Sequence, residues 1–157
     1  MNQISTAQLD RLTRDAAASP RRRMNLNLHA DLADPIQRLA IAMQPETYIR
    51  PHRHGRTWEL LTPLRGRFVV LGFDDAGQVT QRLVLGEDTA VSETPALGWH
   101  AVLSLDDGGV ILEVKHGPYQ PTLGADFAPW SPAPGSPGCA GLMAWYAVAG
   151  VGQCWPG

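Results

Sequence analysis

Two histidines and a glutamate lie close together in RPHRHGRTWELLTPLRG, the segment of residues 50–66. His52 and His54 are two residues apart, so on an extended strand their side chains point to the same face, as two imidazoles that share one cation must. Glu59 lies in an otherwise apolar run, where burying an unpaired carboxylate is costly and coordination to a cation offsets that cost. The spacing therefore indicates a metal site more than a polar strand edge.

A third imidazole is expected from His100, which begins the segment HAVLSL just after the turn residues PALGW. Antiparallel packing can bring that strand end beside the pair formed by His52 and His54. Three histidines and one carboxylate suit Zn, Fe, Mn, Ni or Co and do not distinguish among these metals. We predict one divalent metal ion, bound by His52, His54, Glu59 and His100.

Other polar residues are candidates for catalysis or binding. His116 and Tyr119, in KHGPYQ, are candidate acid and base groups, because histidine titrates near neutrality and a positioned tyrosine hydroxyl can donate a proton. The alternative is a turn with an aromatic lid. Glu113, in VILEVK, either faces the site from the barrel interior or is an edge charge, since both faces of that strand look apolar.

Two features nearer the N-terminus have two interpretations each. His29, in NLNLHAD, either reaches the mouth of the site or closes a hydrogen-bonded loop. The run Arg21, Arg22 and Arg23 either grips a phosphate of a nucleotide sugar or forms a solvated cluster. The pattern alone does not decide between these interpretations.

The elements that must position these residues begin with one helix in residues 1–20. Ser5 and Gln8 fit a capping box, and Pro20 ends the helix after about Ser19. After it, helical periodicity is replaced by short apolar or alternating runs, which are typical of strands. The tight turns DDAG, GED, PALG and DDGG separate them. The predicted strands are IQRLAIAM, TWELLTPL, RFVVLGF, QRLVLGE, TAVSET, WHAVLSL and VILEVK. About seven such strands imply a barrel or sandwich.

Composition limits the possible partners. The chain has 157 residues, of which 44% are hydrophobic and 18% charged, and its formal net charge is −2. This suits one compact domain and gives no electrostatic reason to expect nucleic acid or an anionic membrane. The first residues lack a signal-peptide core, and no segment approaches the roughly 18 apolar residues of a membrane span, so we expect a cytoplasmic protein. Cys139 and Cys154 are predicted to be free thiols.

Residues 133–157 differ from the rest of the chain. They are rich in Pro, Gly and small residues, with LMAWYAVAGV as one apolar island. We treat this segment as a tail that follows a barrel domain of residues 21–132. It is either a weakly ordered extension or a short helix that lies on the barrel.

The motif residues resemble those of the cupin family. The spacing from His52 through His54 and Glu59 to Gly66 is similar to the first cupin motif, which reads H-x-H, three or four residues, E, six residues, G. The second motif reads P-x-G-x-x-H, and Pro95 and His100 keep its separation, although the glycine falls one place later. Departures also occur upstream of the first histidine and after His100, and all of them affect turn residues and leave the metal ligands in place.

More narrowly, the chain resembles the WbuC-type cupin fold metalloproteins, small bacterial proteins often encoded with O-antigen and other polysaccharide biosynthesis genes. The resemblance covers residues 3–132. It implies an all-β protein, with a cupin-type antiparallel jelly-roll β-barrel and a short N-terminal α-helix. It also implies one metal held by the residues that match the motif histidines and glutamate. The segments that carry it include RMNLNLHADLADPIQRLAIAM, YIRPHRH, EVKHGPY and DFAPWSP.

These features predict a metal-dependent enzyme of isomerase, epimerase or lyase type that acts on a sugar, a sugar nucleotide or a hydroxy acid. One or two open positions on the metal can polarise a substrate oxygen, which is Lewis-acid chemistry. If the metal is Fe(II), the same positions admit dioxygen, so a dioxygenase is an alternative. A non-catalytic barrel that binds a saccharide or a metal is another. Sheet edges need covering, and we expect a homodimer.

Overall fold

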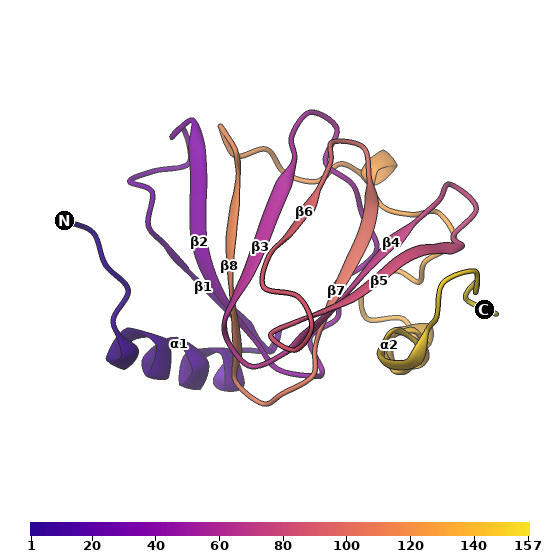
Figure 1. Cartoon of the computed structure of the whole chain (residues 1–157), viewed down its shortest axis with the longest axis horizontal. Coiled ribbons are helices and arrows are strands. Elements are labelled where there is room, and N and C mark those ends of the chain that lie inside the picture. Colours follow the sequence, from indigo (N-terminus) through magenta and orange to yellow (C-terminus); the bar gives the residue numbers. More distant parts are fainter.

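The computed structural model describes residues 1–157, and its strands form a barrel with one α-helix on either side (Figure 1). The elements in chain order are α1 (Thr6–Ala18), β1 (Arg23–Asn27), β2 (Ile36–Met43), β3 (Glu59–Arg65), β4 (Phe68–Phe73), β5 (Val79–Leu85), β6 (Ser92–Thr94), β7 (Trp99–Ser104), β8 (Gly109–His116), the 3-10 helix η1 (Gly124–Asp126) and α2 (Gly138–Val148).

The first helix begins at its predicted cap. The Ser5 hydroxyl accepts a hydrogen bond from the backbone N–H of Gln8 at 3.3 Å, and the Gln8 side chain accepts one from the backbone N–H of Ser5 at 2.8 Å. Both halves of a capping box are therefore present. Leu12 and Ala16 are buried in one apolar cluster with Ala40, Ala42 and Val110. Helix α1 thus covers the outer face of β2 and β8.

The strands form two antiparallel sheets. One has the order β1-β2-β8-β3-β6, and the other has the order β5-β4-β7. Side chains from both sheets meet in one buried cluster, so the sheets enclose an apolar core: Ile41, Met43, Leu61, Phe68, Val70, Leu85, Val102 and Ile111. The predicted all-β antiparallel barrel with a short N-terminal helix is confirmed.

Strand register decides which polar side chains face the barrel interior. Leu61 on β3 pairs with Glu113 on β8, and Glu59 pairs with Lys115. Directly paired residues of antiparallel strands lie on the same face of the sheet, and residues two apart share that face. Because Leu61 and Ile111 belong to the inner core, Glu59, Glu113 and Lys115 also face inward. Of the two interpretations of Glu113, the structure supports the interior position.

Residues 133–157 include a helix that packs on the barrel. Leu142 and Tyr146 of α2 are fully buried against the outer face of the three-stranded sheet, in a cluster with Phe73 and Trp99. Figure 1 shows α2 on the opposite side of the barrel from α1. Of the two interpretations of this segment, the structure shows the helix that lies on the barrel.

The structure contains one strand, β1, that the sequence analysis did not predict. Its sequence, RMNLN, alternates between polar and apolar residues but contains only two apolar side chains, of which Met24 is 39% exposed and Leu26 packs under α1. The strand forms by pairing with β2 along its whole length.

Cys139 and Cys154 are free thiols, as predicted. Neither helix has the length and hydropathy that crossing a membrane requires.

The packing of α2 can be tested by replacing Leu142 with alanine. This side chain is fully buried, so Leu142→Ala should leave a cavity and lower the free energy of unfolding by about 2–5 kcal/mol. Chemical denaturation measures the change. Val148 on the same helix is 77% exposed, and Val148→Ala should change the same quantity by no more than about 0.5 kcal/mol. Equal small effects of both substitutions would contradict this packing.

Candidate metal centre

The four predicted metal ligands lie together inside the barrel. His52 and His54 are in the segment between β2 and β3, Glu59 begins β3, and His100 is the second residue of β7. One ligand atom from each residue lies within 4.8 Å of the others. The five-stranded sheet supplies the carboxylate and the three-stranded sheet supplies one imidazole, so closure of the barrel assembles the site.

Backbone hydrogen bonds join the two motifs directly. The N–H of His52 donates to the carbonyl of His100 at 3.0 Å, and the N–H of His100 donates to the carbonyl of His52 at 2.9 Å. The N–H of Leu97 donates to the carbonyl of His54 at 2.8 Å. The positions of the histidines are thereby fixed by the main chain.

The displaced glycine of the second motif has a structural consequence. Leu97 occupies the motif's glycine position and has a φ of 67°, in the left-handed region. A side chain there costs about 1–2 kcal/mol, and the hydrogen bond to His54 helps to hold the turn. In the first motif, Gly66 has a φ of 73°, and a Cβ atom there would lie 3.2 Å from the Cα atom of Gly109. Both motif turns therefore require left-handed backbone, and only one uses glycine.

Two imidazoles are oriented by carbonyl groups. The Nδ1 atom of His52 lies 2.9 Å from the carbonyl oxygen of Arg50, and the Nδ1 atom of His100 lies 3.0 Å from that of Gly98. Because a carbonyl only accepts, each Nδ1 carries the hydrogen and each Nε2 keeps a lone pair. This is the arrangement of metal-binding histidines, whose other nitrogen donates to a carbonyl or carboxylate.

The donor set fits a metal ion. Nε2 of His100 is buried and makes no hydrogen bond, although it lies 3.2 Å from Oε1 of Glu59. Nε2 of His54 lies 2.9 Å from Oε2 of the same carboxylate. A buried nitrogen lone pair with no donor near it suits coordination, and three imidazoles with one carboxylate form a common donor set for borderline divalent metals.

Electrostatics keep His52 and Glu59 in forms that can coordinate, whereas the carboxylate of Glu59 outweighs burial and raises the pKa of His100. Burial, followed by the neighbouring His100, lowers the pKa of His52 to about 3, so this imidazole is neutral near pH 7. Burial alone would raise the pKa of Glu59, but the imidazoles of His100 and His54 and the charge of Lys115 hold it well below its usual value. Coordination requires a neutral imidazole and an ionised carboxylate.

The structure shows an ion pair beside the metal ligands that the sequence analysis did not include in the site. Nζ of Lys115 lies 2.7 Å from Oε1 of Glu113 and 3.8 Å from Oε2 of Glu59. Burial lowers the pKa of Lys115, but Glu113, Glu59 and, more weakly, Tyr119 raise it overall. Burial and the charge of Glu59 raise the pKa of Glu113. The signal that could have revealed this pair is its spacing of two residues on one strand, together with the register of β8 against β3.

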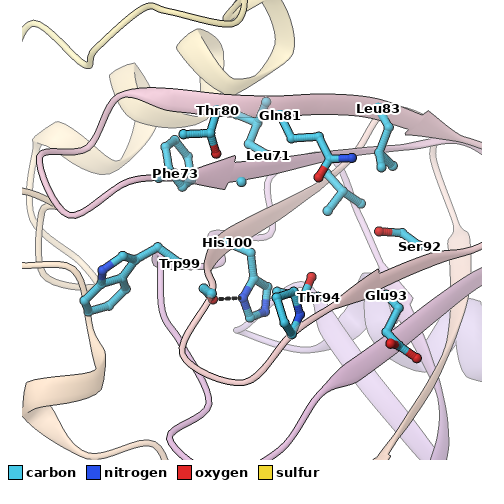
Figure 2. A pocket seen from close by; sticks show the side chains of 14 residues that line it. Leu71, Phe73, Thr80, Gln81, Leu83, Ser92, Glu93, Thr94, Trp99 and His100 are labelled. Atoms are coloured by element: carbon cyan, nitrogen blue, oxygen red, sulfur yellow. Dashed lines mark hydrogen bonds between the residues drawn. The ribbon is translucent and has the colours of Figure 1, made fainter.

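A cleft on the side of the barrel reaches one of the four clustered residues, His100. It has a volume of about 180 Å³ and lies where β5 and β6, the edge strands of the two sheets, approach each other. Figure 2 shows Gln81 of β5 and Ser92 and Thr94 of β6 around this space, with His100 at its inner side. Gly72 pairs with both Gln81 and His100, and its missing side chain leaves room between them.

The two predicted acid and base residues lie at the same end of the barrel as the metal ligands. His116 is exposed and ends β8, one residue after the register partner of Glu59. Alternation along β8 directs its side chain to the face opposite Lys115. Tyr119 is 48% exposed in the loop that follows, and its effect on the pKa of Lys115 shows that its hydroxyl is within electrostatic range. Neither residue contacts the four ligands.

His29 and the three arginines lie outside the ligand cluster. Nδ1 of His29 accepts a hydrogen bond from the backbone N–H of Arg38 at 2.9 Å, so this histidine closes the loop between β1 and β2. Arg22 pairs with Glu46 at 3.4 Å, whereas Arg23 is half-buried at the start of β1. The arginine run therefore does not form a single phosphate grip.

Metal content can test the four ligands. His52→Ala should lower metal affinity by more than the roughly 10- to 100-fold lost with an outer-shell partner, because a direct ligand is removed. Elemental analysis after dialysis against a weak chelator gives the metal per chain. His29→Gln should leave this value unchanged, since His29 lies in the β1–β2 loop. Equal metal content in wild type and His52→Ala would contradict the site.

Removing the metal should also lower thermal stability. A metal at a free concentration of about 100 times its Kd stabilises the native state by about 2.7 kcal/mol, which corresponds to roughly 5–10 °C in Tm for a chain of this size. Thermal unfolding with and without a chelator measures the shift. In His52→Ala, the chelator should have almost no effect, and a shift as large as that of wild type would place the stabilising metal elsewhere.

A family model described as "Domain of unknown function (DUF6016)" matches residues 4–85, just over half of the chain. A comparison with curated proteins finds no match.

Solved structures share the fold at low sequence identity. The protein TT1209 from Thermus thermophilus is 16% identical with a TM-score of 0.55, over 74% of this chain and 97% of that chain. CapF with the inhibitor 3-isopropenyl-tropolone is 18% identical with a TM-score of 0.54, over 66% of this chain and 30% of that chain. Oxalate oxidase in complex with the substrate analogue glycolate is 14% identical with a TM-score of 0.53, over 68% of this chain and 57% of that chain. The predicted cupin-type barrel is confirmed, and the chain belongs to the family described as a domain of unknown function, DUF6016.

Proposed function

We propose that this protein is a metal-dependent enzyme of isomerase, epimerase or lyase type that acts on a small sugar or hydroxy acid. The observation that carries the proposal is the Glu113 and Lys115 ion pair beside Glu59. A barrel that only binds a metal or a saccharide has no need for two more buried charged groups at its site, and burying them is costly. Charged groups that converge on a metal centre are characteristic of catalytic sites.

The substrate class follows from the metal and the cleft. When bound, the metal would act as a Lewis acid that polarises a substrate oxygen. Gln81, Ser92 and Thr94 offer hydrogen-bonding groups along the cleft, which suits a hydroxylated molecule. A volume of about 180 Å³ is below the roughly 300–1,000 Å³ of sites for drug-sized ligands, so the substrate is small. The oxalate oxidase that shares this fold binds glycolate, a hydroxy acid.

The proposed proton-transfer residues are His116 and Tyr119. Both lie at the end of the barrel where Glu59 and Lys115 pair. Tyr119 would donate a proton from its hydroxyl, and His116 would accept one near neutral pH. Lys115 faces the site beside Glu59, whereas the exposed His116 and Tyr119 lie outside the ligand cluster and would exchange protons with a part of the substrate that extends from the metal.

Two finer points of the proposal concern biological context and assembly. The resemblance of the motifs to those of WbuC-type proteins supports a role in the biosynthesis of O-antigen or another polysaccharide.

The strands β1 and β6 are the edges of the five-stranded sheet, and unpaired edges are commonly covered by a second chain. We therefore propose a homodimer, whose mass sedimentation would measure.

Hydrogen exchange can test the proposed reaction type. By the proton-transfer route proposed here, isomerisation, epimerisation and elimination all begin with removal of a proton from a carbon next to the polarised group. The metal-loaded protein in ²H₂O should therefore incorporate deuterium at that carbon in a hydroxy-acid or sugar substrate, as followed by NMR. Loss of a proton-transfer group costs roughly 10²- to 10⁴-fold in rate, and Tyr119→Phe should show such a loss with unchanged metal content.

The matched control is Tyr48→Phe, because the Tyr48 hydroxyl donates to the carbonyl of Pro132 and lies outside the ligand cluster. Tyr48→Phe should keep the wild-type exchange rate. If no hydroxy acid or sugar exchanges hydrogen with the fully loaded wild type, the enzyme proposal fails and the protein is a metal-binding or saccharide-binding cupin.

A further inference from the structure

Lys115 is the only lysine in the chain, since the other twelve of its thirteen basic residues are arginines. It faces the barrel interior, and its side chain is 18% exposed. The positive charges on the protein surface come from arginines, whereas the single ammonium group, that of Lys115, lies beside the metal ligands. Lysine and arginine are not interchangeable at such a position, because the ammonium is a compact point charge with three rotatable donors.

The ammonium group of Lys115 has N–H groups that are not used in hydrogen bonds within the protein. It bonds to Oε1 of Glu113 at 2.7 Å, and its 3.8 Å separation from Oε2 of Glu59 is longer than a hydrogen bond. These two carboxylates are its only ion-pair partners. One of the three N–H groups is therefore used and two remain, next to a carboxylate that ligates the metal.

The charge of the site favours an anion. The carboxylates of Glu59 and Glu113 together balance a divalent cation, and the three histidine ligands are neutral when they coordinate. The charge of Lys115 is then in excess. A neutral sugar would leave this excess uncompensated, whereas one carboxylate group would pair with it.

We propose that Lys115 is a specificity-determining residue that binds the carboxylate of a 2-hydroxy acid while an adjacent substrate oxygen binds the metal. This inference rests on the proposed function and narrows its substrate class from sugars and hydroxy acids to hydroxy acids. Because Nζ lies 3.8 Å from a metal-ligand oxygen, a carboxylate beside Glu59 reaches both groups. Glu113 acts as a positioning residue that holds the ammonium group in place.

Binding of two small probes tests the inference. Glycolate carries a hydroxyl and a carboxylate, whereas ethylene glycol offers the same chelating oxygens without charge. Calorimetric titration of Zn²⁺-loaded protein measures the affinity for each probe, with metal content determined for every sample. The variants are Lys115→Met, Lys115→Arg and Arg11→Met. Arg11 is on α1, with a side chain that is 79% exposed, and its replacement makes the same change in net charge far from the site.

In the wild type, glycolate should bind more tightly than ethylene glycol. Lys115→Met should weaken glycolate by about 10-fold or more, the usual cost of losing one hydrogen bond to a charged group, and should leave ethylene glycol unchanged. Lys115→Arg should keep part of the preference, because the charge is restored with a different shape. Arg11→Met should bind both probes as the wild type does.

Because Lys115→Met leaves Glu113 buried without its partner, the double variant Glu113→Gln and Lys115→Met removes both charges and guards against misfolding. The inference is overturned if either variant, at full metal content, keeps the wild-type preference for glycolate. It is also overturned if the wild type binds both probes equally or binds no Zn²⁺. Lys115-dependent binding of glycolate without any hydrogen exchange would support the inference and contradict the proposed enzyme, so the two failures can be told apart.

Discussion

The barrel interior is organised around one buried carboxylate. Glu59 is 4% exposed, and an ionised group at that depth is tolerated only when positive charge or hydrogen-bond donors surround it. Two imidazoles and an ammonium group approach it from the segment before β3, from β7 and from β8. The outer layers serve this arrangement, because α1 and α2 cover the two sheets from outside and leave the interior to polar groups at one end.

The sequence predicts well which four residues the fold brings together, because the signal for three of them is local. His52, His54 and Glu59 lie within eight residues of one another, and strand alternation alone places the two histidines on one face. His100 needed one additional assumption, that its strand returns antiparallel beside the first motif, and the reciprocal hydrogen bonds between His52 and His100 show that it does. The N-terminal helix was equally accessible, since its cap depends on two residues three apart.

Features that depend on distant pairing could not be predicted in this way. Glu113 and Lys115 lie on a strand whose two faces are similarly apolar, and only its register against β3 reveals which face is inside. Strand β1 has only two apolar residues and is defined by β2, its only strand partner. Residues 133–157 look like a loose tail by composition, yet Tyr146 is fully buried. In each case the deciding interaction comes from a part of the chain that is remote in sequence.

The backbone bridge between His52 and His100 has a consequence for how the protein acquires its cofactor. Main-chain hydrogen bonds hold these two histidines in place, so the cavity is shaped before any ion arrives. A rigid pocket of this kind needs little reorganisation on loading and imposes its own geometry on the incoming ion. Divalent ions bind a given set of ligands in an intrinsic order of strength. Which ion occupies the site would then depend on the geometry of the pocket and on the supply of each ion, as well as on this intrinsic order.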